Sequence, residues 1–334
     1  MGADVAGAER LLEPLLSLHE RVRAAVVDAC ERQATEQLAA VAADDATGGD
    51  TIYAVDRVAE ETFVQGLQEL AREESLCVVG EGLSGASQPE DGRWRLLVDP
   101  IDGTRGLMYQ KRSAWILTGV APNHGPGTRL RDIVLAVQTE IPLLKQHLSD
   151  QLWAIRGRGT EARRFNRLSG ARERLPLSPS GADTIAHGFA TVVRFFPGVR
   201  DVLAAIDDEV SQALVVPPPG QAACFEDQYA STGGQLYELM AGHDRFIADL
   251  RALLQPVRAA RGLSAGLCCH PYDLCTALIA EAAGVILTDP AGAPLDASFD
   301  VTTDVGWIGY ANARLRVSVE PVLREALRRR GLLP

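Results

Sequence analysis

The chain has 334 residues, 46% of them hydrophobic and 23% charged, with a formal net charge of −11. This length predicts one large two-lobed unit or two packed domains, with a sizeable core. The acidic balance argues against a nucleic acid polymer or an anionic membrane as a partner, but it is compatible with a small anion held by a metal. The sequence shows no basic start followed by an apolar core, no apolar run of membrane-spanning length, and no C-x-x-C pair among its six cysteines. We therefore expect a cytoplasmic protein with reduced thiols.

Periodicity places helices at the start of the chain and mixes them with strands later. Apolar residues at helical spacing predict one long helix or two over 9–42, and a further helix over 56–72 has Asp56 as its expected N-cap. The first half also carries short apolar runs typical of strands, at 76–79, 94–98, 115–121, 132–139 and 152–155. Beyond about residue 180, strands are expected at 184–193, 245–249 and 285–288, and helices at 199–210, after 231–234 and at 270–283. The pattern indicates an α+β or α/β fold.

The segment 96–104 is the most informative stretch of the chain. Its apolar run stops at Asp99, and Asp102, Gly103 and Thr104 follow in a turn that a proline and a glycine enforce. Two carboxylates on one turn repel each other unless a cation lies between them, and Mg²⁺ prefers such hard oxygen ligands. The amides of Gly103 and Thr104 would face the same space and bind an anion. The alternative is a surface turn in which Asp102 caps a helix.

Further acids fall in positions where α/β folds collect ligands. Glu81 lies between two glycines just after a strand, and Asp273 lies near the start of a helix. Together with Asp99, Asp102 and the carbonyl of Ile101, they would form an all-oxygen site for two or three Mg²⁺ ions. Such a site suits the in-line attack of water on a phosphoryl group.

Two other catalytic or metal-binding patterns are present but incomplete. The segment 262–266 matches the G-x-S-x-G signature of serine hydrolases. It lacks a preceding buried strand, and His270 is the one histidine after it, with no acid between them. Cys268, Cys269 and His270 are adjacent in sequence, and adjacent residues rarely ligate one tetrahedral metal. We interpret them as the end of a strand or loop.

Three segments, in the same order, resemble the inositol monophosphatase superfamily of Mg²⁺-dependent, often lithium-sensitive phosphatases. This superfamily also includes fructose-1,6-bisphosphatases and 3′(2′),5′-bisphosphate nucleotidases. Residues 80–81 resemble its G-E-E motif, 98–104 its full D-P-[IL]-D-G-[ST] signature, and 272–284 its W-D-x-A…E-A-G-G segment. The resemblance covers most of the chain.

The resemblance implies a layered α-β-α-β-α sandwich whose site lies between two halves. The half 1–179 would carry most metal ligands, and the half 180–334 would supply Asp273 and substrate contacts. A homodimer is also implied. The first Mg²⁺ would be held by Glu81, Asp99 and the carbonyl of Ile101, and the second by Asp99, Asp102 and Asp273.

The same resemblance assigns roles beyond the metal ligands. Thr104, hydrogen-bonded to Asp56, would orient the attacking water together with Glu81. The substrate would be bound by the amides of the Asp-Gly-Thr turn and by the side chains of the metal-site acids, and these substrate contacts are Asp102, Gly103, Thr104 and Asp273. Asp249 would contact a substrate hydroxyl.

Three positions depart from the family pattern. Gly82 replaces the second glutamate of G-E-E, which bears on how many metal ions are bound. Tyr272 replaces the usual tryptophan. The basic tract 105–112 follows Asp-Gly-Thr in place of Asn-Phe, and it is either a solvated loop or, through Arg105, Lys111 or Arg112, a contact for further negative charge on the substrate.

Our main interpretation is a Mg²⁺-dependent phosphomonoesterase that hydrolyses a small phosphorylated polyol or sugar with metal-activated water. Activity of the bisphosphate nucleotidase or fructose-1,6-bisphosphatase type is the alternative within the same class. A catalytically weak sensor that binds metal and an anion is the alternative from a different class, but it has no need for a Thr104–Asp56 pair.

Overall fold

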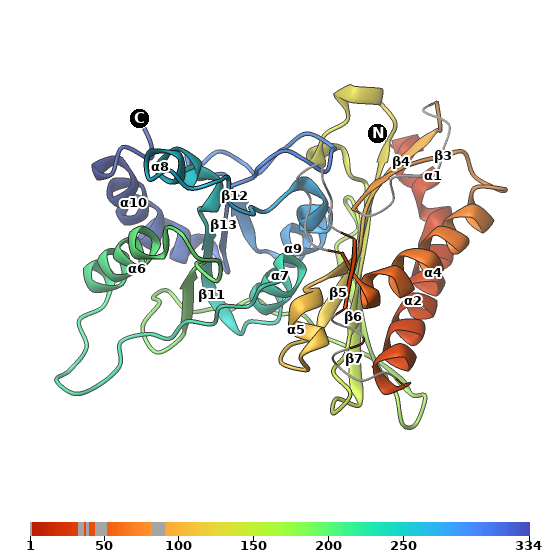
Figure 1. The fold of residues 1–334 in the computed structure, drawn as a ribbon, viewed down its shortest axis with the longest axis horizontal. Coiled ribbons are helices and arrows are strands. Elements are labelled where there is room, and N and C mark those ends of the chain that lie inside the picture. The colour runs from red at the N-terminus through yellow and green to blue at the C-terminus, as the bar shows by residue number, and fades with distance from the viewer. Residues whose placement is uncertain (1, 33–36, 38–39, 44–51, 82–90) are drawn as a thin grey trace.

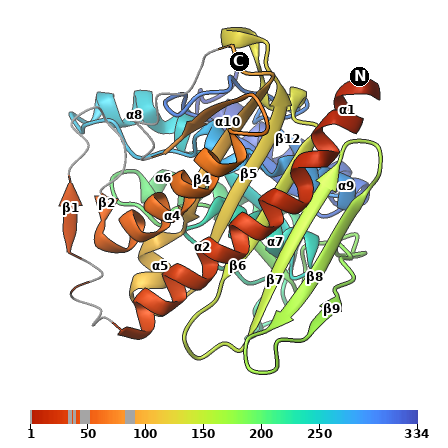
Figure 2. The ribbon, with the colours of Figure 1, turned by 90° about the vertical axis from the view of Figure 1, so that its right-hand side faces the viewer.

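The computed structural model describes residues 2–32, 37, 40–43, 52–81 and 91–334, and Gly82 lies outside them. Five layers follow one another across the molecule (Figure 1). The outer helices α1 (Gly2–Ala8), α2 (Leu12–Arg32) and α4 (Ala54–Leu70) cover one face of a large sheet, as Figure 2 shows from the side. This arrangement agrees with the layered α-β-α-β-α sandwich expected from the sequence.

The large sheet has seven strands in the order β3-β4-β5-β6-β7-β8-β9. The pair β3–β4 is parallel and every other pair is antiparallel. Its strands are β3 (Leu76–Gly80), β4 (Trp94–Asp102), β5 (Ala114–Pro122), β6 (Leu135–Ile141), β7 (Leu148–Ile155), β8 (Thr160–Asn166) and β9 (Arg172–Arg174). A separate short pair is formed by β1 (Val41–Ala43) and β2 (Ile52–Tyr53).

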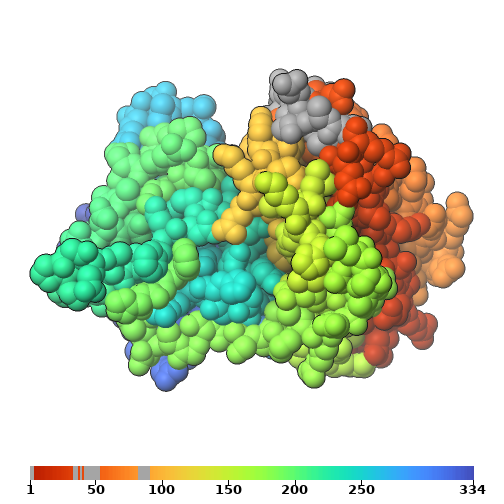
Figure 3. Space-filling model, turned by 90° about the horizontal axis from the view of Figure 1, so that it is seen from below, coloured from red at the N-terminus to blue at the C-terminus, as the bar shows by residue number. Residues whose placement is uncertain are grey.

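The middle layer contains the short helices α7 (Thr232–Met240) and α9 (Ala277–Ala283), whereas the short helix α5 (Thr104–Met108) after β4 buries Leu107 and Met108 in the same core as α2 and α4. The second sheet has the order β10-β11-β13-β12. Its strands are β10 (Phe189–Val192), β11 (Asp244–Asp249), β12 (Ile286–Thr288) and β13 (Trp307–Tyr310). The helices α6 (Arg200–Leu214), α8 (Gln255–Ala260) and α10 (Ala313–Arg329) form the last layer. In the space-filling view the halves meet along the middle of the molecule (Figure 3).

Helices cover both faces of the large sheet, so its central strands are apolar on both sides. In β4, Leu96 and Val98 belong to the core under α2 and α4, whereas Leu97 belongs to the core between the two sheets. Fully buried His19 on α2 is hydrogen-bonded to the hydroxyls of Thr118 (2.9 Å) and Thr139 (3.1 Å) of the sheet. No helix in the described part of the chain is long and apolar enough to cross a membrane.

Several predicted elements differ from the observed ones. The strand predicted over 94–98 continues to Asp102, because the pairing of β4 with β5 shifts register between Asp99 and Asp102 and leaves the proline in the irregular stretch. The helix predicted over 270–283 is broken into the 3₁₀ turn η5 (Pro271–Leu274) and α9. Residues 41–43 form β1 instead of the end of a first helix. The connection 250–270 contains η4 (Arg251–Leu254) and α8.

Candidate metal and phosphate site

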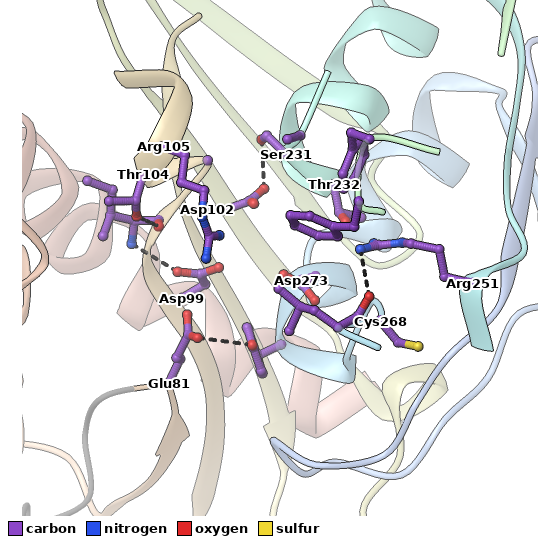
Figure 4. A pocket seen from close by; sticks show the side chains of 17 residues that line it. Glu81, Asp99, Asp102, Thr104, Arg105, Ser231, Thr232, Arg251, Cys268 and Asp273 are labelled. Carbon is purple, nitrogen blue, oxygen red and sulfur yellow. Dashed lines mark hydrogen bonds between the residues drawn. The ribbon is translucent and has the colours of Figure 1, made fainter. Parts of the chain in front are cut away.

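Three aspartates from two distant parts of the chain meet at the end of β4 (Figure 4). One carboxylate oxygen from each of Asp99, Asp102 and Asp273 lies within 4.8 Å of the others. The first two come from the irregular end of β4, and Asp273 comes from η5. The η5 turn holds its acid in place, because the backbone N–H of His270 donates to Asp273 Oδ2 at 2.6 Å. The fold thus brings together acids that are more than 170 residues apart in sequence.

Burial raises the pKa of all three carboxyl groups. The pKa of Asp99 lies well above its usual range because of burial and because the charges of Glu81, Asp102 and Asp273 add to it. Burial also raises the pKa of Asp273 well above its usual range, and the charge of Asp102 adds to the rise. Three ionised carboxylates so close together are unfavourable without a cation. All the donor atoms are hard oxygens, so a divalent ion such as Mg²⁺ fits this group.

Asp102 is the least perturbed of the three, because the second half of the chain donates to it. Burial raises its pKa to about 6, and hydrogen bonds from Ser231 and Gly233 oppose the rise. Ser231 Oγ lies 2.8 Å and the Gly233 amide nitrogen 2.6 Å from Asp102 Oδ2. These bonds fix Oδ2, so Oδ1 is the oxygen of Asp102 that is available to a metal.

Glu81 stands at the edge of this cluster, just after β3. The Tyr272 hydroxyl donates to Glu81 Oε1 at 3.1 Å, and the Tyr272 ring stacks on His270 with 5.4 Å between ring centroids. Tyr272 therefore positions Glu81 beside the aspartates. The indole of the usual family tryptophan has no hydroxyl, so this contact depends on the tyrosine found here.

Thr104 and Asp56 are paired as the resemblance implies. Thr104 Oγ1 donates to Asp56 Oδ1 at 2.7 Å and also lies 3.0 Å from the carbonyl oxygen of Ile101. The predicted N-cap role of Asp56 is wrong, because α4 begins two residues earlier. Asp56 lies in the first turn of α4, where its Oδ2 accepts the backbone N–H of Tyr53 at 2.7 Å.

The turn between β4 and α5 has room for an anion. Gly103 has φ 93°, and a Cβ atom added there would lie 2.9 Å from Ser231 Cβ. Both the left-handed backbone and the close approach therefore require glycine. An open cavity of about 600 Å³, a volume that includes solvent space at its mouth, lies beside this turn. Its polar lining includes Glu81, Asp99, Asp102, Gly103, Thr104, Arg105, Ser231, Thr232, Arg251 and Asp273.

Asp249, the predicted hydroxyl contact, does not line this cavity. Its side chain is fully buried, and Arg251 chelates it, with Nε 2.9 Å from Oδ1 and Nη2 2.6 Å from Oδ2. Burial alone would lower the pKa of Arg251. The charge of Asp249 and its hydrogen bonds outweigh burial, so the pKa of Arg251 lies above its ordinary value. Arg251 thus reaches the cavity wall while its carboxylate partner stays behind it.

The basic tract after the turn is divided between the site and the protein surface. Arg105 lines the cavity, and its guanidinium lies 5.6 Å from the ring centroid of Phe196. Lys111 is exposed and is not a lining residue. Arg112 forms ion pairs with Asp227 and Glu238. Of the three basic residues considered, Arg105 is placed to contact a substrate.

The sequence did not point to Ser231, Thr232 or Arg251 as site residues. The Ser-Thr-Gly-Gly run before a helical pattern was the available signal, since Ser231 caps α7 by accepting the amide of Gly234 at 2.9 Å.

The two incomplete sequence patterns, residues 262–266 and 268–270, do not form catalytic sites in the described part of the chain. The G-x-S-x-G segment follows α8 as a turn and loop, and Cys268 is a neutral wall residue whose pKa burial raises to about 12.

An all-carboxylate cluster beside a glycine turn suits a divalent metal that acts on a phosphoryl group. Residues 11–178, half of the chain, match the model of the inositol monophosphatase family. The chain belongs to this family and is a phosphatase, that is, a phosphoric monoester hydrolase, of the inositol monophosphatase superfamily.

Solved structures share the fold at low sequence identity. The extragenic suppressor protein suhB from Bartonella henselae is 16% identical, with a TM-score of 0.64 and coverage of 95% of this chain and 99% of that one. Fructose-1,6-bisphosphatase from Leishmania major is 14% identical, with a TM-score of 0.65 and coverage of 94% and 93%. The inositol monophosphatase TM1415 from Thermotoga maritima is 15% identical, with a TM-score of 0.61 and coverage of 95% and 98%. A search of curated proteins found no match.

Proposed function

We propose that this protein is a Mg²⁺-dependent phosphomonoesterase that hydrolyses a small phosphorylated polyol or sugar. The main observation behind this proposal is that carboxylate oxygens of Asp99, Asp102 and Asp273 lie within 4.8 Å of one another beside the Gly103 turn. The pairing of Thr104 with Asp56 at 2.7 Å supports catalysis over mere binding, because a sensor needs no polarised hydroxyl at this place.

Two or three Mg²⁺ ions would be held in this site. Glu81, Asp99 and the carbonyl of Ile101 would ligate one ion, and Asp99, Asp102 and Asp273 a second. When bound, Mg²⁺ neutralises the carboxylates, lowers the pKa of water and stabilises negative charge on the phosphoryl group.

The protein's own groups would orient the reactants. Thr104 donates a hydrogen bond to Asp56, so its oxygen is free to accept a hydrogen bond from the attacking water. Glu81 would accept the other proton as the water oxygen bonds to phosphorus and the bond from phosphorus to the ester oxygen breaks, and a proton from solvent water would complete the leaving alcohol. Phosphate oxygens would accept from the amides of Gly103 and Thr104, and Arg105 would add positive charge. Asp102 and Asp273 would also contact the substrate.

The proposal extends to the setting of the enzyme. We place it in the cytoplasm as a homodimer, with a small phosphorylated molecule as substrate and neither nucleic acid polymer nor membrane as partner. Residues 1–179 would form one functional half, and residues 180–334 the other. Asp249 is proposed to act on the substrate only through Arg251.

A phosphate-release assay over polyol, sugar and nucleotide phosphates tests this function. Wild type should release phosphate with Mg²⁺ and not with EDTA. Asp99→Asn should lower kcat at least about a thousandfold, as expected for loss of a metal-held reaction centre. Asp201→Asn is the matched control, because this exposed aspartate pairs with Arg261 away from the site. Turnover of no compound, or an Asp99→Asn variant as active as wild type, would refute the proposal.

A further inference from the structure

Arg251 is a cation in the wall of the cavity that contains the acid cluster. It begins η4 directly after β11, it lines the cavity, and its side chain is 10% exposed. Figure 4 shows the side chain extending from η4 toward the aspartates. Burial raises the pKa of Asp102 and of Asp273, and the charge of Arg251 opposes the rise at both. The guanidinium of Arg251 therefore faces the space in which a substrate would lie.

Protein acceptors take up three of the five N–H groups of this guanidinium. Nε donates to Asp249 Oδ1 at 2.9 Å, Nη2 donates to Asp249 Oδ2 at 2.6 Å, and Nη1 donates to the carbonyl oxygen of Leu267 at 3.1 Å. One N–H on each terminal nitrogen has no acceptor in the part of the chain that the structure describes. A buried donor without an acceptor is unfavourable, so a ligand that brings two acceptor oxygens is stabilised here.

The surroundings hold the guanidinium in one orientation. It lies 4.7 Å from the ring centroid of Phe195 and 5.4 Å from that of Phe196. The backbone N–H of Arg251 also donates to Asp249 Oδ1 at 3.1 Å, which ties the residue to the end of β11. Because the fork is already fixed, it loses little side-chain entropy on binding, and its two remaining N–H groups match the two oxygens of a carboxylate.

The charge balance of this wall selects among possible acceptors. Asp249 is fully buried behind Arg251 and neutralises it, so the pair has no surplus charge and suits a singly charged carboxylate better than a phosphate dianion. The carboxylates among the described lining residues are the four acids of the metal site, Glu81, Asp99, Asp102 and Asp273. Arg251 thus offers donors where the sequence predicts that Asp249 accepts from a substrate hydroxyl.

We propose that Arg251 binds a carboxylate of the substrate, so that the preferred substrate is the phosphate ester of a hydroxy acid or sugar acid. The proposal rests on the proposed function, since the phosphate of the same molecule is the one hydrolysed at the acid cluster. The bound molecule would extend across the cavity from the end of β4 to the start of η4. Asp249 is the positioning residue that holds Arg251 for this contact.

Paired substrates that differ only by a carboxylate in place of a hydroxymethyl group test this contact. Phosphate release is compared for 2-phosphoglycerate and glycerol 2-phosphate, for 3-phosphoglycerate and glycerol 3-phosphate, and for gluconate 6-phosphate and glucitol 6-phosphate. Wild type should show a kcat/KM at least about tenfold higher for the acid in one pair, the size expected of charge-assisted hydrogen bonds. The pair that shows the preference gives the spacing between the carboxylate and the phosphate.

Variants of Arg251 separate recognition of the carboxylate from support of the fold. Arg251→Lys keeps a cation beside Asp249 but loses the fork, so the preference should fall at least about fivefold, through a raised KM for the acid. The double variant Asp249→Asn with Arg251→Gln removes the pair without leaving a buried charge, and its preference should disappear. A merely structural role for Arg251 would change both substrates of a pair equally.

A second buried pair with the same geometry supplies the matched control. Arg164 chelates buried Asp150 through the same two atoms, with Nε 2.7 Å from Oδ1 and Nη2 2.7 Å from Oδ2, and neither residue lines the cavity. The double variant Asp150→Asn with Arg164→Gln should therefore keep the wild-type preference for the acid.

The outcomes keep this contact and the proposed function apart. Equal kcat/KM values within all three pairs in wild type, or a preference that is unchanged in Arg251→Lys, overturn the contact while the phosphatase stands. If no compound is hydrolysed, the proposed function fails, and calorimetric titration with the same pairs and Mg²⁺ tests the contact directly. Tighter binding of an acid that Arg251→Lys weakens then supports the contact, and equal affinities within each pair overturn it.

Discussion

The Thr104 hydroxyl has one proton and two acceptors within reach, Asp56 Oδ1 at 2.7 Å and the carbonyl oxygen of Ile101 at 3.0 Å. A charged carboxylate is the stronger acceptor, and the carbonyl is the atom that we propose as a metal ligand. A metal bound to the Ile101 carbonyl oxygen would therefore leave Asp56 as the acceptor of the hydrogen bond from the Thr104 hydroxyl. The Thr104 oxygen would then present its lone pairs to the attacking water.

This hydrogen bond from Thr104 to Asp56 predicts how variants of Thr104 behave. Thr104→Val keeps the shape but loses the hydroxyl, so kcat should fall about a hundredfold to a thousandfold while the Mg²⁺ concentration for half-maximal activity changes little. Thr104→Ser keeps the hydroxyl and should stay within about tenfold of wild type. Steady-state phosphate release over a Mg²⁺ series measures both quantities. A Thr104→Val variant with nearly normal kcat would show that this hydroxyl does not orient the water.

His19 predicts an acid-sensitive contribution to stability. Burial lowers its pKa from 6.5 to about 3, and the nearby charge of Arg23 adds to the shift. The unfolded chain takes up a proton at His19 near pH 6.5, whereas the folded chain does not until about pH 3. The stabilisation is therefore complete above about pH 6.5 and is lost as the pH falls toward 3.

Urea unfolding of wild type and His19→Gln measures this effect. Between about pH 7.5 and 5, wild type should lose about 2 kcal/mol that the variant does not lose, which is 1.5 pKa units at 1.36 kcal/mol each. Replacing the buried imidazole also changes the free energy of unfolding by an amount that does not depend on pH. This cost cancels when the pH dependence of the free energy of unfolding is compared between the two proteins. Parallel slopes for the two proteins would contradict the prediction.

At the scale of elements, the irregular end of β4 concentrates charge that the metal-free fold tolerates poorly. The raised pKa values of Asp99 and Asp273 mean that the folded chain holds protons which the unfolded chain has lost. The stabilisation from these groups is present at low pH and is lost as the pH rises through the raised pKa values. Mg²⁺ competes with these protons, so its effect should grow with pH. Thermal unfolding should show a larger rise in Tm on adding Mg²⁺ at about pH 8 than at about pH 5.

The same charge predicts that a site variant is stabilised. In EDTA at about pH 8, Asp99→Asn should raise the free energy of unfolding by about 1–3 kcal/mol, because it removes one buried charge and its amide oxygen still accepts the Ile101 N–H at 2.9 Å. Asp102→Asn is the comparison, and it should gain less because Ser231 and Gly233 already stabilise that carboxylate. Denaturant unfolding measures both. A destabilised Asp99→Asn would mean that the cluster is not electrostatically strained.

Sequence patterns predicted elements where apolar periodicity is strong and missed them where it is weak. Central strands such as β5 and β6 are buried on both faces and stand out as apolar runs. The edge strand β9 reads Arg-Glu-Arg and is exposed, so it carries no such signal. The helix α10 contains Pro321, which is unfavourable inside a helix, yet buried leucines such as Leu315 and Leu323 hold it against the second sheet layer. Tertiary packing decides such cases.

The site was predictable to the extent that its residues sit in motifs. Asp99, Asp102 and Asp273 were found because each falls in a recognisable segment, and the structure brings them together. Arg251 and Arg258 belong to no motif. They line cavities only because of the path that η4 and α8 take. Their position depends on how the second half packs, which local sequence does not encode.

At the scale of the whole molecule, the site is also the seam between the two sheet layers. Asp102 from the large sheet accepts hydrogen bonds from Ser231 and Gly233 at the start of α7, and Tyr272 from η5 donates to Glu81 after β3. The second half thus supplies groups that position two acids of the first half. Metal binding and packing of the halves are therefore coupled, because both depend on the same carboxylates.

Ser231→Ala tests this coupling. Ser231 Oγ donates to Asp102 at 2.8 Å and accepts the Gly234 amide at 2.9 Å, so its loss removes an inter-half bond and a helix cap together. The free energy of unfolding should fall by about 1–3 kcal/mol, and the Mg²⁺ affinity should weaken about tenfold or more because Asp102 loses a fixing partner.

Asn312→Ala is the matched control for that variant. Asn312 caps α10 by accepting the amides of Arg314 (2.9 Å) and Leu315 (3.1 Å), and it lies outside the acid cavity. It should lose similar stability with unchanged Mg²⁺ affinity. Denaturant unfolding gives the stability, and calorimetric titration with Mg²⁺ gives the affinity. If Ser231→Ala binds Mg²⁺ as tightly as Asn312→Ala does, the seam and the metal site are independent, and Asp102 alone determines its own geometry.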